Sequence, residues 1–329
     1  MSAFLTRATR YAISRTRLGE AASKIGDFCH HFYYSFSERT PEKDKQRLKF
    51  YLFKYHHIIE KGLALPKPNL CFGQPKIINL IEKSESYVKK YGHDKIIDSI
   101  KKTIIEYLAF HEKQGATLPE KFERKLLDFS AQANSNCIGG LRPVVKSEMN
   151  NLTPQEFNDF VRCRYSVRNF SNEPVDENLI FTAIETATYA PSVCNRQSWH
   201  VHYYSEKNTI RNILYHQNGN AGFADTIDKL LIITGDTRAF TENESNQIFV
   251  DGGLFSMNLI LALHSAGLGS CALNTSYSYL KEHSVKKIAR IPNSERLIMM
   301  LAVGHTKQNF DVAASPRKPK YDFFTTHNY

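Results

Sequence analysis

Three arginines and a serine lie close together at positions 162 to 168 of this 329-residue chain. In the sequence Arg162-Cys-Arg164-Tyr-Ser166-Val-Arg168 they occupy alternate positions, so they would face the same side if the segment is extended. Guanidinium groups bind phosphate through charge-assisted hydrogen bonds. This strip could therefore hold a phosphate group. The alternative is a row of surface ion pairs.

A second group of polar side chains follows a predicted apolar helix. Pro191 and Ser192 should end that helix. Asn195 and Gln197 then present amides from a loop that leads to Trp199, the only tryptophan of the chain. Such amides can hydrogen-bond to the edge of a heterocycle. The alternative is a polar loop whose tryptophan anchors the hydrophobic core.

A glycine pair and a serine, Gly267, Gly269 and Ser270, follow a second apolar helix, predicted over residues 252–266. Glycine allows a backbone to approach a flat ligand closely, and an amide N–H at such a position could donate to a ring nitrogen. G-x-G alone is a weak signal. Neither G-x-G-x-x-G after a first strand nor G-x-x-x-x-G-K-[ST] occurs, so the sequence favours neither a Rossmann dinucleotide site nor a P-loop.

Two different patterns of elements must position these residues. Apolar residues at three- and four-residue spacing predict helices over residues 47–61, 76–91, 93–114 and 119–131. Residues 131–155 lose this periodicity and predict a linker, so we place a domain boundary near residue 150, with a helical unit over 1–150 and a second unit over 151–329.

After the linker, helices alternate with strands, which is typical of an α/β or α+β domain. The pattern predicts helices over 154–162, with Thr153 as the N-cap, and over 176–189. It predicts strands over 200–204, 229–234 and 296–304.

The positive charge lies in the first unit. The net charge is +10; residues 1–150 hold 26 Lys and Arg against 16 Asp and Glu, whereas the remainder holds 17 of each. This asymmetry indicates a basic appendage on a neutral body. No run approaches the roughly 20 apolar residues that a spanning helix needs, and six scattered cysteines favour neither a disulfide framework nor a zinc site, so we expect a reducing, cytoplasmic setting.

Taken in order, five motifs resemble those of the nitroreductase family. They are an R-x-S-x-R-x-F segment, an A-P-S-x-x-N-x-Q-x-W loop, an apolar helix running into G-L-G-S, a strand ending in G-H, and a late basic pair. Here they lie at residues 164–170, 190–199, 254–270, 301–305 and 317–318. The resemblance covers about residues 157–320. One departure is Ser198, where many relatives have proline.

The resemblance implies an α+β fold, with a mixed sheet flanked by helices, and an obligate homodimer that holds FMN at its interface. By position, the flavin contacts from one subunit would be Arg164 near the phosphate, Ser166, and Arg168 near the pyrimidine edge. The contacts from the other subunit would be Pro191, Ser192 and Asn195.

Further contacts are implied later in the chain. Gly269 and Ser270 would face the flavin N5 and are the residues expected nearest the reaction. Arg317 and Lys318 would bind the phosphate, and Asn220 is a weaker match to an asparagine that meets the isoalloxazine ring.

The implied activity is an FMN-dependent oxidoreductase in which NAD(P)H reduces the flavin, leaves, and is followed by an electron-poor acceptor such as a quinone, nitro or conjugated compound. No Ser/His/Asp site is required, because the cofactor carries the hydride chemistry. The alternatives are a reductive dehalogenase, a dehydrogenase of a peptide or sugar intermediate, and a non-catalytic flavin-fold protein with a basic binding region.

The first unit matches no motif with a mechanism. His56, His57 and Glu60 have helical metal-binding spacing but too few ligands, so no metal site is predicted. Interleaved aromatics, including Phe32, Tyr33, Phe36, Phe50 and Tyr51, are expected in the core. Residues 1–19 carry four arginines and no acid, which predicts a basic helix or tail, with a membrane-surface helix or a targeting segment as alternatives. We expect this unit to be separable and to bind a membrane surface or a protein rather than nucleic acid. The alternative is that its helices cap the second unit and cover the active site.

Overall fold

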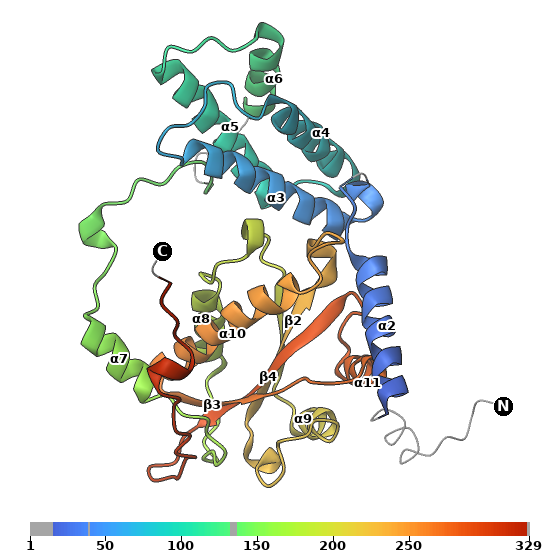
Figure 1. Ribbon diagram of the computed structural model, residues 1–329, viewed down its shortest axis with the longest axis vertical. Coiled ribbons are helices and arrows are strands. Elements are labelled where there is room, and N and C mark those ends of the chain that lie inside the picture. The colour runs from blue at the N-terminus through green and yellow to red at the C-terminus, as the bar shows by residue number, and fades with distance from the viewer. Residues whose placement is uncertain (1–15, 39, 132–136, 328–329) are drawn as a thin grey trace, which may run out of the picture.

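The computed structural model describes residues 16–38, 40–131 and 137–327 (Figure 1). Before the linker, the helices are α2 (Arg17–Tyr34), α3 (Lys45–Leu63), α4 (Gln74–Tyr91), α5 (Lys95–Lys113) and α6 (Glu120–Ser130). Helices α3 to α6 confirm the four predicted helices to within two residues at each end. They surround a core of their own, in which Leu48, Leu52, Ile81, Ile100 and Tyr107 have no exposed surface.

After the linker come α7 (Pro154–Arg162), α8 (Glu177–Ala187), β1 (Trp199–Tyr204), α9 (Lys207–Leu214), β2 (Lys229–Asp236), α10 (Gln247–Ser265), β3 (Leu268–Leu273), α11 (Tyr279–Ala289) and β4 (Glu295–His305). Short 3₁₀ turns lie at Pro41–Lys43, Lys146–Glu148, Val193–Asn195, Ala224–Thr226, Thr237–Ala239 and Lys320–Asp322. Helix α7 begins as predicted, with Thr153 and Glu156 forming a capping box.

The strands form one sheet in the order β1-β2-β4-β3, and all three strand pairs are antiparallel. The predicted α+β fold is confirmed. The predicted mixed character of the sheet is limited, within the described residues, to one parallel bridge between Ser166 and Ser270.

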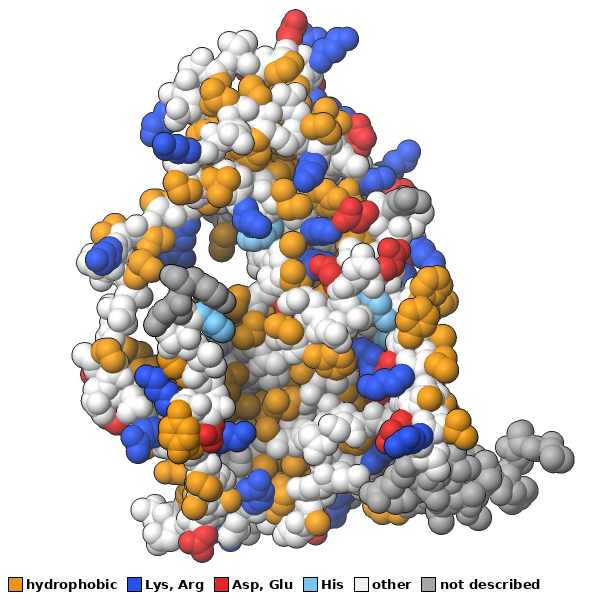
Figure 2. Space-filling model, in the orientation of Figure 1, with side chains coloured by type: hydrophobic (Ala, Val, Ile, Leu, Met, Phe, Trp, Pro, Cys, Tyr) orange, Lys and Arg blue, Asp and Glu red, His pale blue; other side chains and the backbone are white. Residues whose placement is uncertain are grey.

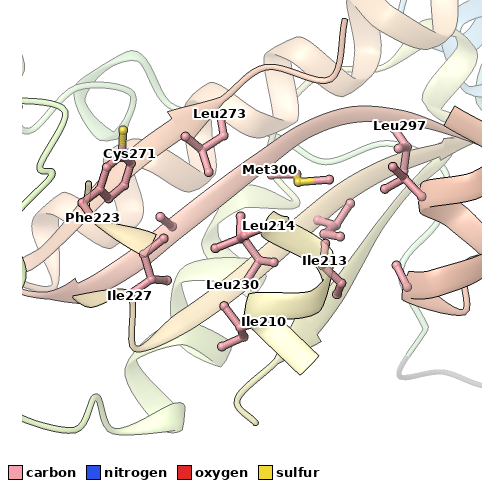
Figure 3. Packing of buried hydrophobic residues seen from close by; sticks show 14 of the residues in the cluster. Ile210, Ile213, Leu214, Phe223, Ile227, Leu230, Cys271, Leu273, Leu297 and Met300 are labelled. Atoms are coloured by element: carbon pink, nitrogen blue, oxygen red, sulfur yellow. The ribbon is translucent and has the colours of Figure 1, made fainter. Parts of the chain in front are cut away.

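Helices cover both faces of this sheet, because successive side chains of β2 are apolar and point to opposite faces. Leu230 and Ile232 pack with α9 and α11 on one face, as the close view in Figure 3 shows for Leu230. Leu231 and Ile233 pack with α8 and α10 on the other face. Helix α10 is long and apolar enough to cross a membrane by length and composition, but half of it is buried, as in the core helix of a domain.

Several elements were not predicted. Residues 268–273 were expected only as the glycine-rich end of a helix, whereas they form strand β3. Helices α9 and α11 were also missed. The aromatic prediction is partly wrong: Phe36, Phe50 and Tyr51 are buried, but Phe32 and Tyr33 are 72% and 64% exposed.

The His56/Glu60 motif has a structural role at the start of the linker. The hydroxyl of Thr103 donates to the Ser99 carbonyl, so its oxygen accepts from His56 Nε2 at 2.7 Å. The backbone N–H of Gly140 donates to that same oxygen at 2.8 Å and to Glu60 Oε1 at 3.2 Å. These contacts attach the linker to α3 and α5. The division of the chain near residue 150 stays a proposal.

Candidate functional site

The predicted basic strip lies along strand β3. Ser166 forms the parallel bridge with Ser270, and the N–H of Val167 donates to the Ser270 carbonyl at 2.9 Å. Val167 is buried, whereas Arg168 is exposed. Arg162 is the last residue of α7, so it does not continue the strip, which is limited to positions 164, 166 and 168.

The strip carries uncompensated positive charge. Among the described residues, no carboxylate lies within ion-pair distance of Arg164 or Arg168. Burial raises the pKa of the Cys271 thiol, and the positive charge of Arg168 opposes that rise, which places this guanidinium near the middle of β3. Cations without a carboxylate partner can bind an anionic group such as phosphate.

Gly269 is required by packing. A Cβ atom at this position would lie 2.9 Å from Thr306 Cγ2 and 3.1 Å from Val167 Cγ2. Gly269 and Ser270 pair with Gly304 and Val303 of β4. The structure therefore brings both residues to the basic strip, and their position opposite a flavin N5 stays a prediction.

The loop between α8 and β1 has an unusual backbone. Cys194, Asn195 and Gln197 all have positive φ angles, of 49°, 51° and 49°. Residues other than glycine rarely adopt this backbone conformation, and such strain often marks a functional segment. The hydroxyl of Ser192 accepts the Gln197 N–H at 3.1 Å, which fixes the turn.

Two buried charges hold this loop in place. Arg196 has no exposed surface; it donates to Glu244 through two nitrogens at 2.7 and 2.8 Å and to the Ala239 carbonyl at 2.6 Å. Burial opposes ionisation of Glu244, but hydrogen bonds from Arg196 and Thr241 outweigh it and lower the pKa of Glu244 to about 2. The Asp251 carboxylate accepts the Val193 N–H from the other side.

This loop is distant from the basic strip of the same chain. Ser270 pairs with Val303, whereas Trp199 pairs with Gly235, which in turn pairs with Arg296. At about 3.4 Å per strand residue, positions 296 and 303 of β4 are roughly 24 Å apart. One chain therefore does not bring Pro191, Ser192 and Asn195 together with the strip.

The remaining predicted residues have separate positions. Asn220 is buried, and its amide donates to Leu214 and Gln217, which closes the loop after α9. Gln217 in turn donates to the Asn274 carbonyl just beyond β3. Arg317 and Lys318 are exposed on the C-terminal segment, and among the described residues no carboxylate pairs with them.

A cavity of about 1010 Å³ lies between α2, the start of α10 and the segment that follows β3. Four buried side-chain polar atoms of the described residues have no hydrogen-bond partner, and three belong to residues that line this cavity: His30 Nδ1, Thr237 Oγ1 and Tyr277 OH. His30 Nε2 lies 2.7 Å from the Asn293 carbonyl and must donate to it, so Nδ1 is an acceptor. Sequence reasoning missed this group because its members come from three distant segments.

Part of the chain is similar to one known protein family. The nitroreductase family model matches residues 161–231 and 214–305 in two overlapping stretches. Similar solved structures include a nitroreductase family protein from Streptococcus pneumoniae, 22% identical over 52% of this chain and 100% of that chain, with a TM-score of 0.43. An FMN-dependent nitroreductase from Clostridium difficile is 16% identical over 52% and 98%, with a TM-score of 0.44. A nitroreductase-like protein from Streptococcus mutans is 22% identical over 54% and 100%, with a TM-score of 0.46.

The matched stretch begins at the end of α7 and closes with β4, so it contains the basic strip, the strained loop and the whole sheet. Residues 161–305 therefore form a nitroreductase-family domain, which follows a helical N-terminal region.

Proposed function

We propose that this chain is an FMN-dependent oxidoreductase that uses NAD(P)H to reduce an electron-poor acceptor, namely a quinone, nitro or conjugated compound. The observation that carries the proposal is the basic strip, with its unpaired Arg164 and Arg168, bridged to β3 inside a nitroreductase-family domain. A cytoplasmic homodimer is part of the same proposal.

The residues of the strip fit FMN by charge. The phosphate dianion needs cations that no protein carboxylate neutralises, and Arg164, Arg317 and Lys318 meet this condition within the described residues. Arg168, farther along the strip, would favour negative charge on the pyrimidine edge of the ring. Pro191, Ser192 and Asn195 would reach the flavin from the second subunit, since the β4 positions that mark the loop and the strip, 296 and 303, are roughly 24 Å apart.

When bound, FMN would supply the hydride chemistry, and the protein would bind, orient and shield it. We place the acceptor in the cavity beside α2, because β3 leads from Ser270 directly to its lining residues Ala272 and Asn274. The hydroxyls of Thr237 and Tyr277 can donate to an acceptor carbonyl or nitro oxygen, and neutral His30 can accept from an N–H or O–H group. The dehalogenase and dehydrogenase alternatives would use the same flavin residues and differ in what enters this cavity.

The test is the absorption spectrum of the purified protein. We expect flavin bands that persist through gel filtration, with about one FMN per subunit. Anaerobic titration with NADH and with NADPH should bleach these bands, and a quinone should restore them. Colourless protein that also fails to take up added FMN would overturn the proposal.

A further inference from the structure

Helix α2 presents an apolar face to the outside. Leu18, Ile25, Phe28 and Phe32 are 82%, 64%, 69% and 72% exposed. At 3.6 residues per turn these positions share one face of the helix, and the smaller exposed residues of that face are Ala21, Ala22 and Cys29. Figure 2 shows the corresponding orange side chains along the edge where Figure 1 draws α2.

The opposite face of α2 is polar, and it is the face that contacts the flavin domain. Asp27 pairs with Arg296 at 2.9 Å, and His30 Nε2 donates to the Asn293 carbonyl. The Ser23 hydroxyl accepts the Tyr279 N–H at 2.8 Å. Gly26 lies against Tyr279, whose ring would be 2.6 Å from an added Cβ. These contacts fix the rotation of the helix, so the described part of the chain leaves Leu18 and Ile25 uncovered, while Phe28 and Phe32 are exposed and also line the cavity beside α2.

The charges around this face are positive. Arg17 and Lys24 are exposed and lie seven residues apart, so they line one flank of the apolar face. The acids of the helix lie away from it, since Glu20 is on the far side and Asp27 is paired with Arg296. The sequence before residue 19 adds Arg7, Arg10 and Arg15 and no acid.

We propose that α2 binds an anionic lipid membrane surface, with its apolar face in the headgroup region and its cations on the lipid phosphates. Apolar residues on one face, with Arg and Lys beside them, are the features of a helix that lies in the plane of a membrane. Each Arg or Lys near an anionic surface tightens binding about fivefold. A second copy of the chain is a poorer occupant, because a twofold interface would bring the same cationic flank of both copies together.

The experiment is co-sedimentation of the full chain with phosphatidylcholine vesicles, with and without about 30% phosphatidylglycerol. We expect binding to the anionic vesicles to be at least about tenfold tighter and to weaken as salt is raised. Phe28→Ser/Phe32→Ser should weaken it about tenfold or more, because two exposed aromatic rings no longer enter the bilayer. The matched control is Leu127→Ser on α6, which removes a side chain that is 53% exposed on the helical bundle and should leave binding unchanged.

A second variant separates charge from apolar contact. Arg17→Glu/Lys24→Glu keeps the apolar face and should lower the preference for phosphatidylglycerol about tenfold or more. Circular dichroism would show that each variant keeps the helical content of the wild type. Equal binding by the wild type and the Phe28/Phe32 variant, or no binding to either vesicle, would overturn the proposal. So would a smaller oligomer of that variant without vesicles, since a second copy would then be what covers α2.

Discussion

Arg196 is a fully buried cation whose partner, Glu244, lies 48 residues later in the chain. The pair connects the strained loop at residues 191–197 to the segment that precedes α10. Removing one member of a buried pair leaves the other charge without compensation, which costs about 3 kcal/mol or more. We therefore expect Arg196→Met to lower the free energy of unfolding by about 3 kcal/mol in urea titrations.

The matched control for this change is Arg211→Met. Arg211 pairs with Asp225 at 2.9 Å, but both side chains are more than half exposed. Exposed pairs of this kind contribute about 0–1 kcal/mol. If the two substitutions lower the free energy of unfolding by the same amount, the buried pair does not hold the loop.

The three arginines near the strip should differ in their effect on FMN. Arg164→Ala and Arg317→Ala remove proposed phosphate contacts, each about 1.5–3 kcal/mol, and should weaken FMN binding about ten- to a hundredfold. Arg162→Ala should have little effect, because Arg162 belongs to α7. Flavin fluorescence titration measures all three affinities, and equal losses would show that the strip is assigned in the wrong register.

The sequence predicted the site features that lie within one short motif. It did not predict contacts between segments that are far apart in the chain. The strip was predicted from a motif because that motif is local, whereas its bridge to Ser270 came from the structure. The Arg196–Glu244 pair and the unpaired atoms of His30, Thr237 and Tyr277 have no local signature, since only the fold brings them together.

At the scale of elements, His30 couples the docking of α2 to pH. Burial lowers the pKa of His30 from 6.5 to about 4, although the hydrogen bond to Asn293 acts in the opposite direction. The unfolded chain then binds the proton more readily than the folded chain. As far as His30 is concerned, the free energy of unfolding is therefore at its full value above about pH 6.5. It decreases as the pH falls toward 4, by an amount on the order of 3 kcal/mol.

We expect His30→Gln to reduce this loss, because glutamine can donate to the Asn293 carbonyl but does not titrate. The measurement is the urea midpoint at pH 7.5 and at pH 5, compared between variant and wild type. His283→Gln, at an exposed position of α11, is the control. An unchanged pH dependence in His30→Gln would refute the coupling.

Periodicity predicted α3 to α6 because each buries one face in a local core. The same reasoning placed Phe32 in the core and was wrong, because α2 docks through its polar face. Strand β3 was missed because its glycine and serine weaken the strand signal, and its pairing with β4 decides the structure instead.

For the whole molecule, the distance between the loop and the strip predicts that FMN retention needs two chains. Dilution should release flavin as dimers dissociate, because Pro191, Ser192 and Asn195 would then leave the flavin of the other subunit. Sedimentation velocity followed at the flavin absorption band checks this. A flavin-loaded species that sediments as a monomer at micromolar concentration would contradict it.

The contacts of the N-terminal region bear on whether it can be removed. Phe50 of α3 packs in one cluster with Phe240 and Ile248 of the domain at residues 161–305, and Phe36 N–H donates to the Phe240 carbonyl at 3.0 Å. We therefore expect a chain that starts near Met149 to expose this cluster and to lose soluble yield or flavin. Full yield and normal flavin content in the shortened chain would show instead that the N-terminal region is separable.

The linker is open to cleavage by a protease. Residues 141–159 are exposed throughout, and the hydrogen bonds of residues 145–152 are local. Trypsin should cut after Lys146, since exposed segments with few tertiary contacts are the preferred sites of proteolysis. The Asp27–Arg296 pair and the Phe50 cluster would still join the two polypeptides. The nicked protein should therefore migrate as one particle under native conditions and as two bands after denaturation.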